Sequence, residues 1–392
     1  MKSVAVIGAG IAGITTAYYL VKEGYKVVVF DQERYAAMRT SYSNGGQISV
    51  SNSEVWTTWS NVIKGAKWIF KKDAPLLIGT KLDYDKFVWI SKFLLTTISN
   101  DYARNTVTTI QLGLESRSLY NKIIEEENLK FDQSNCGILH FYKDQKYYNQ
   151  AVLAKNLYNA NNVEWDIINP DQINKLEPNL QSQNIIGGAW TKSDWTGDIH
   201  LFCNNLKTIL ECKYDVKFVF DNKIYIKTLD STFDYVVVCA GVGSVEISKD
   251  LKEKLPIYPV KGYSITINDV DPALLPKVSL LDDQAKIVTS TLGNRLRVAG
   301  TAEFAGENYD IKKDRIDPLL NWVKVNLPQI STKNYSPWTC LRPMTPNMLP
   351  IIKQSDKNKK IFYNTGHGHL GWTLSPATAK QLINLINAKE NK

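Results

Sequence analysis

Residues 4–13 read Val-Ala-Val-Ile-Gly-Ala-Gly-Ile-Ala-Gly, and residues 26–31 read Lys-Val-Val-Val-Phe-Asp. The apolar run 4–7 predicts a buried strand, and the glycines after it stand in the order G-x-G-x-x-G. An amphipathic run to Gly24 then precedes a second apolar strand. A strand, a glycine turn, a helix and a second strand in this order predict a dinucleotide-binding site.

Each part of this motif has a physical role in holding a pyrophosphate. Gly8 allows a sharp turn, Gly10 leaves room for the phosphates, and Gly13 lets the helix and strand pack closely. The free N–H groups at the helix start, from Ile11 onward, face the anion. Asp31 ends the second strand, where a carboxylate binds ribose hydroxyls and repels the 2′-phosphate of NADP. The motif does not distinguish FAD from NAD.

Length and composition indicate a globular protein of two joined domains. The chain has 392 residues, of which 44% are apolar. Glycines interrupt its apolar N-terminus and no cleavage pattern follows, so we expect an unprocessed, cytoplasmic protein. The five cysteines form no C-x-x-C pair and are expected to be reduced, with no metal site. The net charge of +8 is not concentrated in a basic stripe with aromatic platforms, which argues against a nucleic-acid partner.

Three later segments have the composition of cofactor contacts. The loop 39–47 is rich in hydroxyls and glycine, and its residues alone leave open whether it is an ordinary surface loop or a second contact. The apolar run 233–241 ends in Ala-Gly and predicts a strand buried on both faces of the same sheet. Residues 365–372 follow a strand at 361–364 and precede a helix predicted to begin at Ser375-Pro376.

The remaining segments indicate a second domain inserted into the first. Strands at 137–142, 257–267 and 285–302 and helices at 84–100 and 106–127 are not in alternating strand-helix order. We therefore predict an α/β fold, with a discontinuous Rossmann-like cofactor domain and a mixed α+β substrate-binding domain. The cofactor domain is expected at 1–55, 196–250 and 335–392, and the substrate domain at 56–195 and 251–334.

The stretch 56–72 has two interpretations. It interleaves Trp56, Trp59 and Trp68 with lysines in a helix-like pattern. Such a helix either covers the substrate pocket or lies on an anionic membrane surface. The second interpretation would place the protein peripherally on the inner face of the cytoplasmic membrane. The stretch is too short and too polar to span a bilayer.

Seven segments occur in an order that resembles one family. They read G-A-G-I-A-G, T-S-Y-S-N-G-G-Q, V-V-V-C-A-G, Y-P-V-K-G-Y-S, R-V-A-G-T-A-E, L-R-P-M-T-P and T-G-H-G-H-L-G-W-T. The series resembles the bacterial D-amino acid dehydrogenase small subunit, within the D-amino acid oxidase and glycine oxidase family of FAD-dependent oxidoreductases. The resemblance covers nearly the whole chain. His369 stands where the family pattern has Thr, and Arg39 where it has an acid.

The resemblance implies an FAD cofactor and a set of residues that bind it. The set combines the N-terminal motif, the loop 39–47, the end of the strand 233–241 and the last glycine-rich turn. Its members are Gly8, Gly10, Ile11, Ala12, Gly13, Asp31, Gln32, Arg39, Thr40, Ser41, Asn44, Gly45, Gly46, Gln47, Ala240, Gly241, Gly366, His367, Gly368, His369, Leu370, Gly371, Trp372 and Thr373.

The resemblance also implies oxidative deamination of a D-amino acid to a 2-oxo acid and ammonia. A hydride passes from the substrate Cα to flavin N5, and the electrons pass to a quinone or another carrier. Arg342 is expected to clamp the substrate carboxylate, since burying an unpaired carboxylate is costly and a guanidinium binds both oxygens. Its alternative role is a structural arginine beside Pro343.

Other candidates keep two interpretations each. Tyr263 either contacts the carboxylate or packs in the core, and His367 either donates to the flavin or fixes its loop. Glu303 either orients a charged group in the site or forms a salt bridge without catalytic importance, and Arg297 has the same alternatives. His200 is expected to cap or orient local backbone rather than to act as a base.

Three other functions remain open at this point. An oxidase of the glycine or sarcosine type would use oxygen directly. A non-catalytic sensor would bind the dinucleotide without turning over a substrate. An NAD-dependent dehydrogenase would be colourless.

Overall fold

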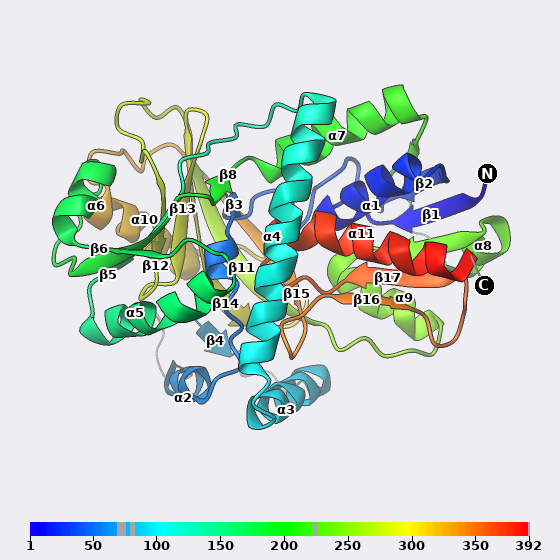
Figure 1. Ribbon diagram of the computed structural model, residues 1–392, viewed down its shortest axis with the longest axis horizontal. Helices are drawn as coiled ribbons and strands as arrows, with labels where there is room; N and C mark the ends of the chain where they lie inside the picture. Colours follow the sequence, from blue (N-terminus) through cyan, green and yellow to red (C-terminus); the bar gives the residue numbers. More distant parts are fainter. Residues whose placement is uncertain (69–75, 79–82, 223–225, 391–392) are drawn as a thin grey trace.

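The computed structural model describes residues 1–392 apart from 69–75, 79–82, 223–225 and 391–392. Two sheets lie toward opposite ends of the long axis, and a long helix, α4, crosses between them (Figure 1). The described helices are α1 (Ile11–Lys22), α2 (Trp59–Trp68), α3 (Tyr84–Ile98), α4 (Tyr102–Glu127), α5 (Gln145–Ala160), α6 (Pro170–Leu176), α7 (Ile199–Tyr214), α8 (Ile226–Thr232), α9 (Ser244–Asp250), α10 (Lys313–Asn326) and α11 (Gly371–Glu390). No helix in this described part is both long and apolar enough to cross a membrane.

The first sheet has six strands in the order β16-β17-β10-β1-β2-β9. The pairings from β9 to β17 are parallel, and β16 is antiparallel at the edge. The strands are β1 (Ser3–Ile7), β2 (Lys26–Phe30), β9 (Lys217–Val219), β10 (Tyr235–Val238), β16 (Ile351–Gln354) and β17 (Ile361–Thr365).

Both faces of this sheet are covered by helices. Val4 and Val6 belong to the core shared with α1, α7 and α11, whereas Ala5 and Ile7 belong to the core shared with α8 and α9. Burial on both faces explains why these strands are continuous apolar runs. The strand-helix-strand unit predicted from the opening motif is confirmed, and β10 lies beside β1 in the same sheet as predicted.

The second sheet has nine strands, eight of them in the order β15-β11-β14-β13-β12-β5-β7-β6, with β4 paired to β14. Helix α10 packs on β11 and β14, and α5 and α6 pack near β7. The strands are β4 (Leu76–Ile78), β5 (Ile138–Tyr142), β6 (Asp166–Ile168), β7 (Gly187–Thr191), β11 (Tyr258–Ile267), β12 (Ser279–Asp282), β13 (Ile287–Leu292), β14 (Arg295–Phe304) and β15 (Tyr335–Met344). A small ribbon of β3 (Gln47–Ile48) and β8 (Trp195–Thr196) joins the two halves.

Several predicted boundaries shift in the structure. Residues 335–344, assigned from the sequence to the cofactor domain, form β15 and pair with β11 of the nine-stranded sheet. Helix α4 begins at Tyr102 rather than Thr106. The stretch 56–72 forms α2 over Trp59–Trp68, and its predicted residues 69–72 lie outside the described part of the chain.

The start of the last helix was predicted wrongly. Ser375-Pro376 has the pattern of a helix start, yet α11 begins at Gly371 and contains Pro376. Proline has no N–H for the carbonyl of Trp372, four residues earlier. The hydroxyl of Tyr120 on α4 donates to that carbonyl instead, at 2.7 Å. This contact from another helix replaces the missing bond, and neighbouring residues alone do not reveal it.

Candidate active site

A cavity of about 770 Å³ joins the two sheets. Its wall includes the ends of β1, β2 and β10, parts of β11 and β14, and the inner sides of α2 and α3. The predicted site residues on this wall are Gly8, Gly10, Ile11, Ala12, Asp31, Gln32, Arg39, Thr40, Ser41, Asn44, Gly45, Gly46, Gln47, Ala240, Gly241, Tyr263, Arg342, His367, Gly368, His369, Leu370, Gly371, Trp372 and Thr373. Segments spread over the whole sequence thus meet at one cavity.

Gly13 and Gly366, which were also predicted to bind the cofactor, do not line the cavity. A Cβ at Gly13 would lie 1.7 Å from the Gly8 carbonyl oxygen, so Gly13 serves the close packing of α1 on its strand. Gly366 has a φ of 75°, a left-handed conformation in which glycine is favoured. Both glycines shape the turns that carry the wall.

The glycine turn after β1 leaves bare backbone at the start of α1. A Cβ at Gly10 would meet nothing closer than Ser41 Oγ at 3.4 Å, and Ile11 N donates to the same Oγ at 3.1 Å. The first N–H groups of a helix have no partner within the helix and are suited to a phosphate. Asp31 Oδ2 accepts from Ala9 N at 2.6 Å, and burial raises the pKa of its carboxyl. These features fit the pyrophosphate and ribose of a dinucleotide.

The loop 39–47 is held in place from the nine-stranded sheet. Three successive carbonyls of the loop each accept a bond from a different strand. Ser264 Oγ donates to Ser43 O at 2.8 Å, Arg297 Nη1 to Asn44 O at 2.9 Å, and Ser290 Oγ to Gly45 O at 2.7 Å. No local sequence pattern predicts this arrangement, because the three donors come from strands far along the chain.

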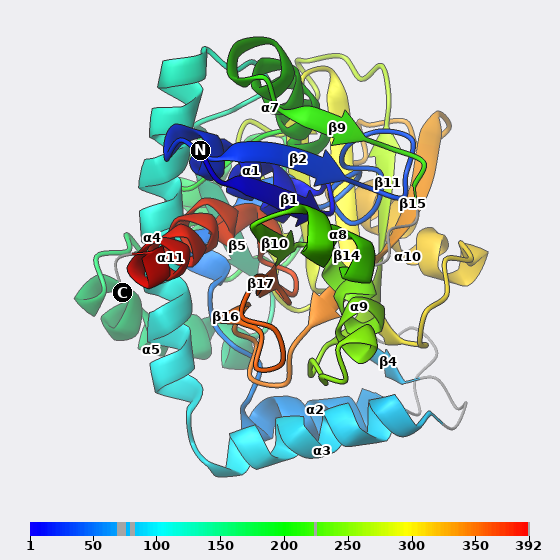
Figure 2. The ribbon, with the colours of Figure 1, turned by 90° about the vertical axis from the view of Figure 1, so that its right-hand side faces the viewer.

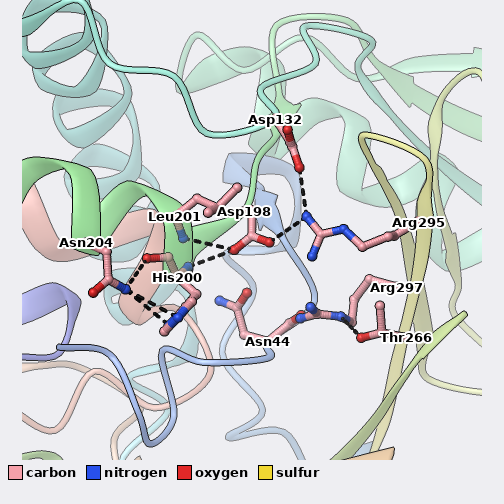
Figure 3. Close-up of polar contacts among 9 residues, drawn as sticks. All are labelled: Asn44, Asp132, Asp198, His200, Leu201, Asn204, Thr266, Arg295 and Arg297. Atoms are coloured by element: carbon pink, nitrogen blue, oxygen red, sulfur yellow. Dashed lines mark hydrogen bonds and ion pairs between the residues drawn. The ribbon is translucent and has the colours of Figure 1, made fainter. Parts of the chain in front are cut away.

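Arg297 is therefore a support for the loop (Figure 3). Its Nε donates to Thr266 Oγ1 at 2.8 Å, and burial lowers the pKa of its guanidinium to about 10. These bonds match neither role considered from the sequence. Those roles were to orient a charged group in the site or to form a salt bridge without catalytic importance.

A neighbouring network ties the start of α7 to β14 (Figure 3). Asp198 caps the helix by accepting from the backbone N–H groups of His200 and Leu201, and it pairs with Arg295 at 3.0 Å. His200 is not the capping side chain. Its Nδ1 lies 3.3 Å from the Ala37 carbonyl oxygen, which agrees with the predicted role in orienting backbone.

The turn 366–373 brings a buried histidine, His367, and a partly buried one, His369, to the cavity. His367 Nε2 lies 2.9 Å from Thr378 Oγ1 on α11, and burial lowers the pKa of its imidazole to about 4. His369 stacks on Trp56 with ring centroids 4.8 Å apart. Burial lowers the pKa of His369, and with the smaller effects of the Arg342 and Lys286 charges the pKa falls to about 3. Both rings are therefore neutral at pH 7.

Arg342 lies on β15 and reaches the cavity beside β11 and β14. Its Nη1 donates to the Thr301 carbonyl at 2.8 Å, and a Cβ at Gly262 would lie only 2.6 Å from its Nη2. Thr301 has a φ of 63°, a strained conformation that recurs at functional sites. Burial lowers the pKa of Arg342, and no acidic side chain in the described residues forms an ion pair with it. The guanidinium is therefore available to an anionic ligand.

Tyr263 lines the cavity, but its hydroxyl is already engaged. It donates to Glu303 Oε2 at 2.7 Å, and Lys312 Nζ lies 2.8 Å from Glu303 Oε1. Burial raises the pKa of Glu303, but the bonds from Lys312 and Tyr263 outweigh it and lower the pKa overall. Glu303 thus forms a salt bridge and fixes Tyr263, and it does not orient Arg342 directly.

Asp283 and Lys286 form an ion pair at 3.1 Å on the cavity wall, and neither residue was predicted to belong to the site. Both residues lie in the turn between β12 and β13. A polar turn of this kind has the sequence of an ordinary surface loop, so composition gives no signal for its position.

The fold and cavity define a class: proteins that bind a dinucleotide on a Rossmann-like sheet beside a second, substrate-binding half. The model of the FAD dependent oxidoreductase family (DAO) matches residues 3–385, and the chain belongs to this family. FAD is therefore its cofactor, and the bare backbone at Gly10 and Gly241 leaves room for it on the wall.

Curated relatives match over nearly their full length. The chain is 43% identical to D-amino acid dehydrogenase 3 of Mesorhizobium japonicum, covering 98% of this chain and 97% of that protein. It is 33% identical to D-amino acid dehydrogenase of Dechloromonas aromatica, with the same coverage of both. Glycine oxidase from Geobacillus kaustophilus has a similar structure, with a TM-score of 0.77 at 16% identity over 99% of this chain and 95% of that one. At that identity the structural similarity shows the fold alone.

Proposed function

We propose that this chain is a D-amino acid dehydrogenase, which oxidises a D-amino acid to an imino acid that water hydrolyses to a 2-oxo acid and ammonia. The observation that carries the proposal is Arg342, a partly buried guanidinium without a carboxylate partner among the described residues, on the wall of a cofactor cavity. The full-length similarity to proteins named D-amino acid dehydrogenase supports the same substrate class.

The cofactor contacts follow from the cavity wall. The first turn of α1 would hold the pyrophosphate, Asp31 the ribose, and the loop 39–47 and turn 366–373 the flavin. Helix α11 begins at Gly371, so its N-terminal end lies at the cavity wall. Its positive end favours negative charge on a flavin held beside it. FAD, when bound, supplies the acceptor for the hydride.

Arg342 would fix the substrate by its carboxylate. A bidentate, charge-assisted pair contributes roughly 1.5 to 3 kcal/mol and sets the direction in which the Cα–H points. Tyr263, held by Glu303, would close the pocket beside this carboxylate. The neutral His367 would order the flavin turn through Thr378 instead of acting as a base at pH 7. No strong base is required once the substrate amine is neutral.

We further propose that a quinone or another carrier accepts the electrons. The word dehydrogenase in the names of the full-length relatives supports this over direct use of oxygen. Peripheral membrane contact through residues 56–72 and α3, at the inner face of the cytoplasmic membrane, would bring the cavity close to a lipid-dissolved quinone.

The test is an anaerobic absorbance spectrum of the purified protein before and after D-amino acids, L-amino acids, glycine and sarcosine. We expect a yellow protein that D-amino acids bleach, with fast recovery on adding a quinone and slow recovery in air. Fast recovery in air would favour an oxidase. A yellow protein that no amino acid bleaches would contradict the proposed function and favour a non-catalytic sensor.

A further inference from the structure

The turn between β12 and β13 places a lysine on the cavity wall. Lys286 lines the cavity with its side chain 51% exposed, and its Nζ lies 3.1 Å from Asp283 Oδ1. Its backbone has a φ of 55°, a conformation that non-glycine residues adopt uncommonly. Val288, two residues further on, also lines the cavity and faces the cofactor loop. A Cβ at Gly45 would lie 2.6 Å from Val288 Cγ2.

The turn is fixed from the protein side, so the lysine is held in position. Asp282 Oδ1 accepts from the backbone N–H groups of Gln284 and Ala285, and its Oδ2 accepts from Trp322 Nε1 at 2.9 Å. Asp283 Oδ2 lies 3.0 Å from His140 Nδ1. The other nitrogen of His140 lies 3.2 Å from Ser51 Oγ. Within this network, Lys286 is the side chain of the turn that remains largely exposed on the cavity wall.

Of the two charges in this pair, the lysine is the one that a ligand would meet. Asp283 is only 18% exposed, and its two oxygens already face Lys286 and His140. An ammonium carries three donors, so Lys286 retains two beyond its bond to Asp283. Glu54, the other carboxylate whose charge acts on Lys286, does not line the cavity. The pair is therefore suited to an anionic group of a ligand and poorly suited to a cationic one.

Lys286 and Arg342 act on the same part of the cavity. Both lie on its wall, and both charges act on His369, which lines it as well. We propose that Lys286 is a specificity-determining residue that binds a second carboxylate at the end of the substrate side chain, while Arg342 binds the α-carboxylate. The preferred substrates are then acidic D-amino acids. This inference rests on the proposed function for the substrate class, but its test below does not need turnover.

The test uses two redox-inert acids of equal length, glutarate and pentanoate, which differ by one carboxylate. Their dissociation constants are measured by the change in the flavin spectrum of the holoenzyme. We expect glutarate to bind at least tenfold tighter to the wild type, about 1.4 kcal/mol. Lys286→Met should reduce this ratio to about one and leave pentanoate binding within twofold. Lys286→Arg should retain most of the preference, because it keeps the charge.

Lys252→Met is a matched control. Lys252 is exposed, has a φ of 56°, and does not line the cavity, so its substitution should leave both constants unchanged. If Lys286→Met fails to retain FAD, Lys286→Gln repeats the test with a neutral side chain of similar length.

An unchanged ratio in Lys286→Met, or no preference for glutarate in the wild type, overturns the subsite. Failure of both acids to perturb the flavin overturns the subsite and the Arg342 clamp together. A preference that depends on Lys286 in a protein that no D-amino acid bleaches would support the subsite and contradict only the proposed function. With turnover, the same ratio is expected in kcat/KM for D-glutamate over D-norvaline.

Discussion

Holding the Arg342 guanidinium in the cavity wall without a ligand lowers the stability of the folded protein. A partly buried cation without a carboxylate partner among the described residues loses part of its hydration, and the bond to the Thr301 carbonyl replaces little of it. Glycine at residue 262 leaves room for this position of the guanidinium, because a Cβ there would lie 2.6 Å from Nη2. A substrate carboxylate would supply the missing opposite charge and lower this cost.

We expect Arg342→Ala to retain FAD and to raise KM about tenfold to hundredfold, since a charge-assisted pair contributes roughly 1.5 to 3 kcal/mol. Arg342→Lys should recover part of the loss, because it keeps the charge but not the planar fork. Steady-state kinetics with a D-amino acid and an artificial acceptor measures both variants. Arg104→Ala, at an exposed arginine paired only with Asp101 among the described residues, is the control. Kinetics for Arg342→Ala that match the wild type would refute the carboxylate assignment.

At the scale of elements, the sequence predicts those features that neighbouring residues determine. The first strand, glycine turn, helix and second strand follow from the spacing of Gly8, Gly10 and Gly13, and β10 follows from an unbroken apolar run. The predicted residues of the loop 39–47 and nearly all of the turn 366–373 line the cavity as the cofactor prediction requires.

Features that depend on contacts between distant segments could not be predicted. Three donors from three strands hold the carbonyls of Ser43, Asn44 and Gly45, and no local pattern links them to that loop. The start of α11 depends on a hydroxyl from α4, and the place of residues 335–344 depends on pairing with β11. Lys286 was missed for the same reason, because its significance lies in the cavity that it faces.

The turn 366–373 should make stability depend on pH. His369 has a pKa of about 3 in the folded protein, against about 6.5 for an unfolded chain, so its folded state binds the proton more weakly. The contribution of the neutral His369 to the free energy of unfolding is fully present above pH 6.5. It is lost as the pH falls toward 3, at about 1.4 kcal/mol per pH unit. His369→Thr should therefore flatten the fall in stability between pH 6.5 and 4.5.

Urea unfolding of the holoenzyme, followed by tryptophan fluorescence, measures this effect at several pH values. Above pH 7.5 the free energies of unfolding of the wild type and of His369→Thr should change with pH in parallel, because the histidine is neutral in both the folded and the unfolded wild type. His367, with a pKa of about 4, remains in the variant and leaves part of the acid sensitivity. Parallel curves down to pH 4.5 would show that His369 is not held neutral in the folded protein.

For the molecule as a whole, α2 and α3 have two different sides. They lie at one end, below the sheets in the view of Figure 2. Their inner sides line the cavity through Asn61, Val62, Trp89 and Phe93. The outer side of α3 exposes a stripe of large apolar residues at helical spacing, Tyr84, Phe87, Leu95 and Ile98, and α2 adds Trp59 and Ile63. Helices that cover the cavity also present an apolar surface outward, so the two interpretations of 56–72 are compatible.

This arrangement predicts binding to anionic vesicles through the outer side of the two helices. The net charge of +8 supplies attraction that salt screens, and the apolar stripe supplies burial in the headgroup region. The protein should sediment with the vesicles at low salt and less at moderate salt. The double substitution Phe87→Ser and Leu95→Ser removes apolar side chains that are 70% and 63% exposed. It should abolish sedimentation and leave bleaching by D-amino acids unchanged.

Leu153→Ser, at an exposed leucine on α5, is the control and should sediment like the wild type. A wild type that stays in the supernatant at both salt concentrations would exclude this membrane contact, and the carrier would then have to reach the cavity from water.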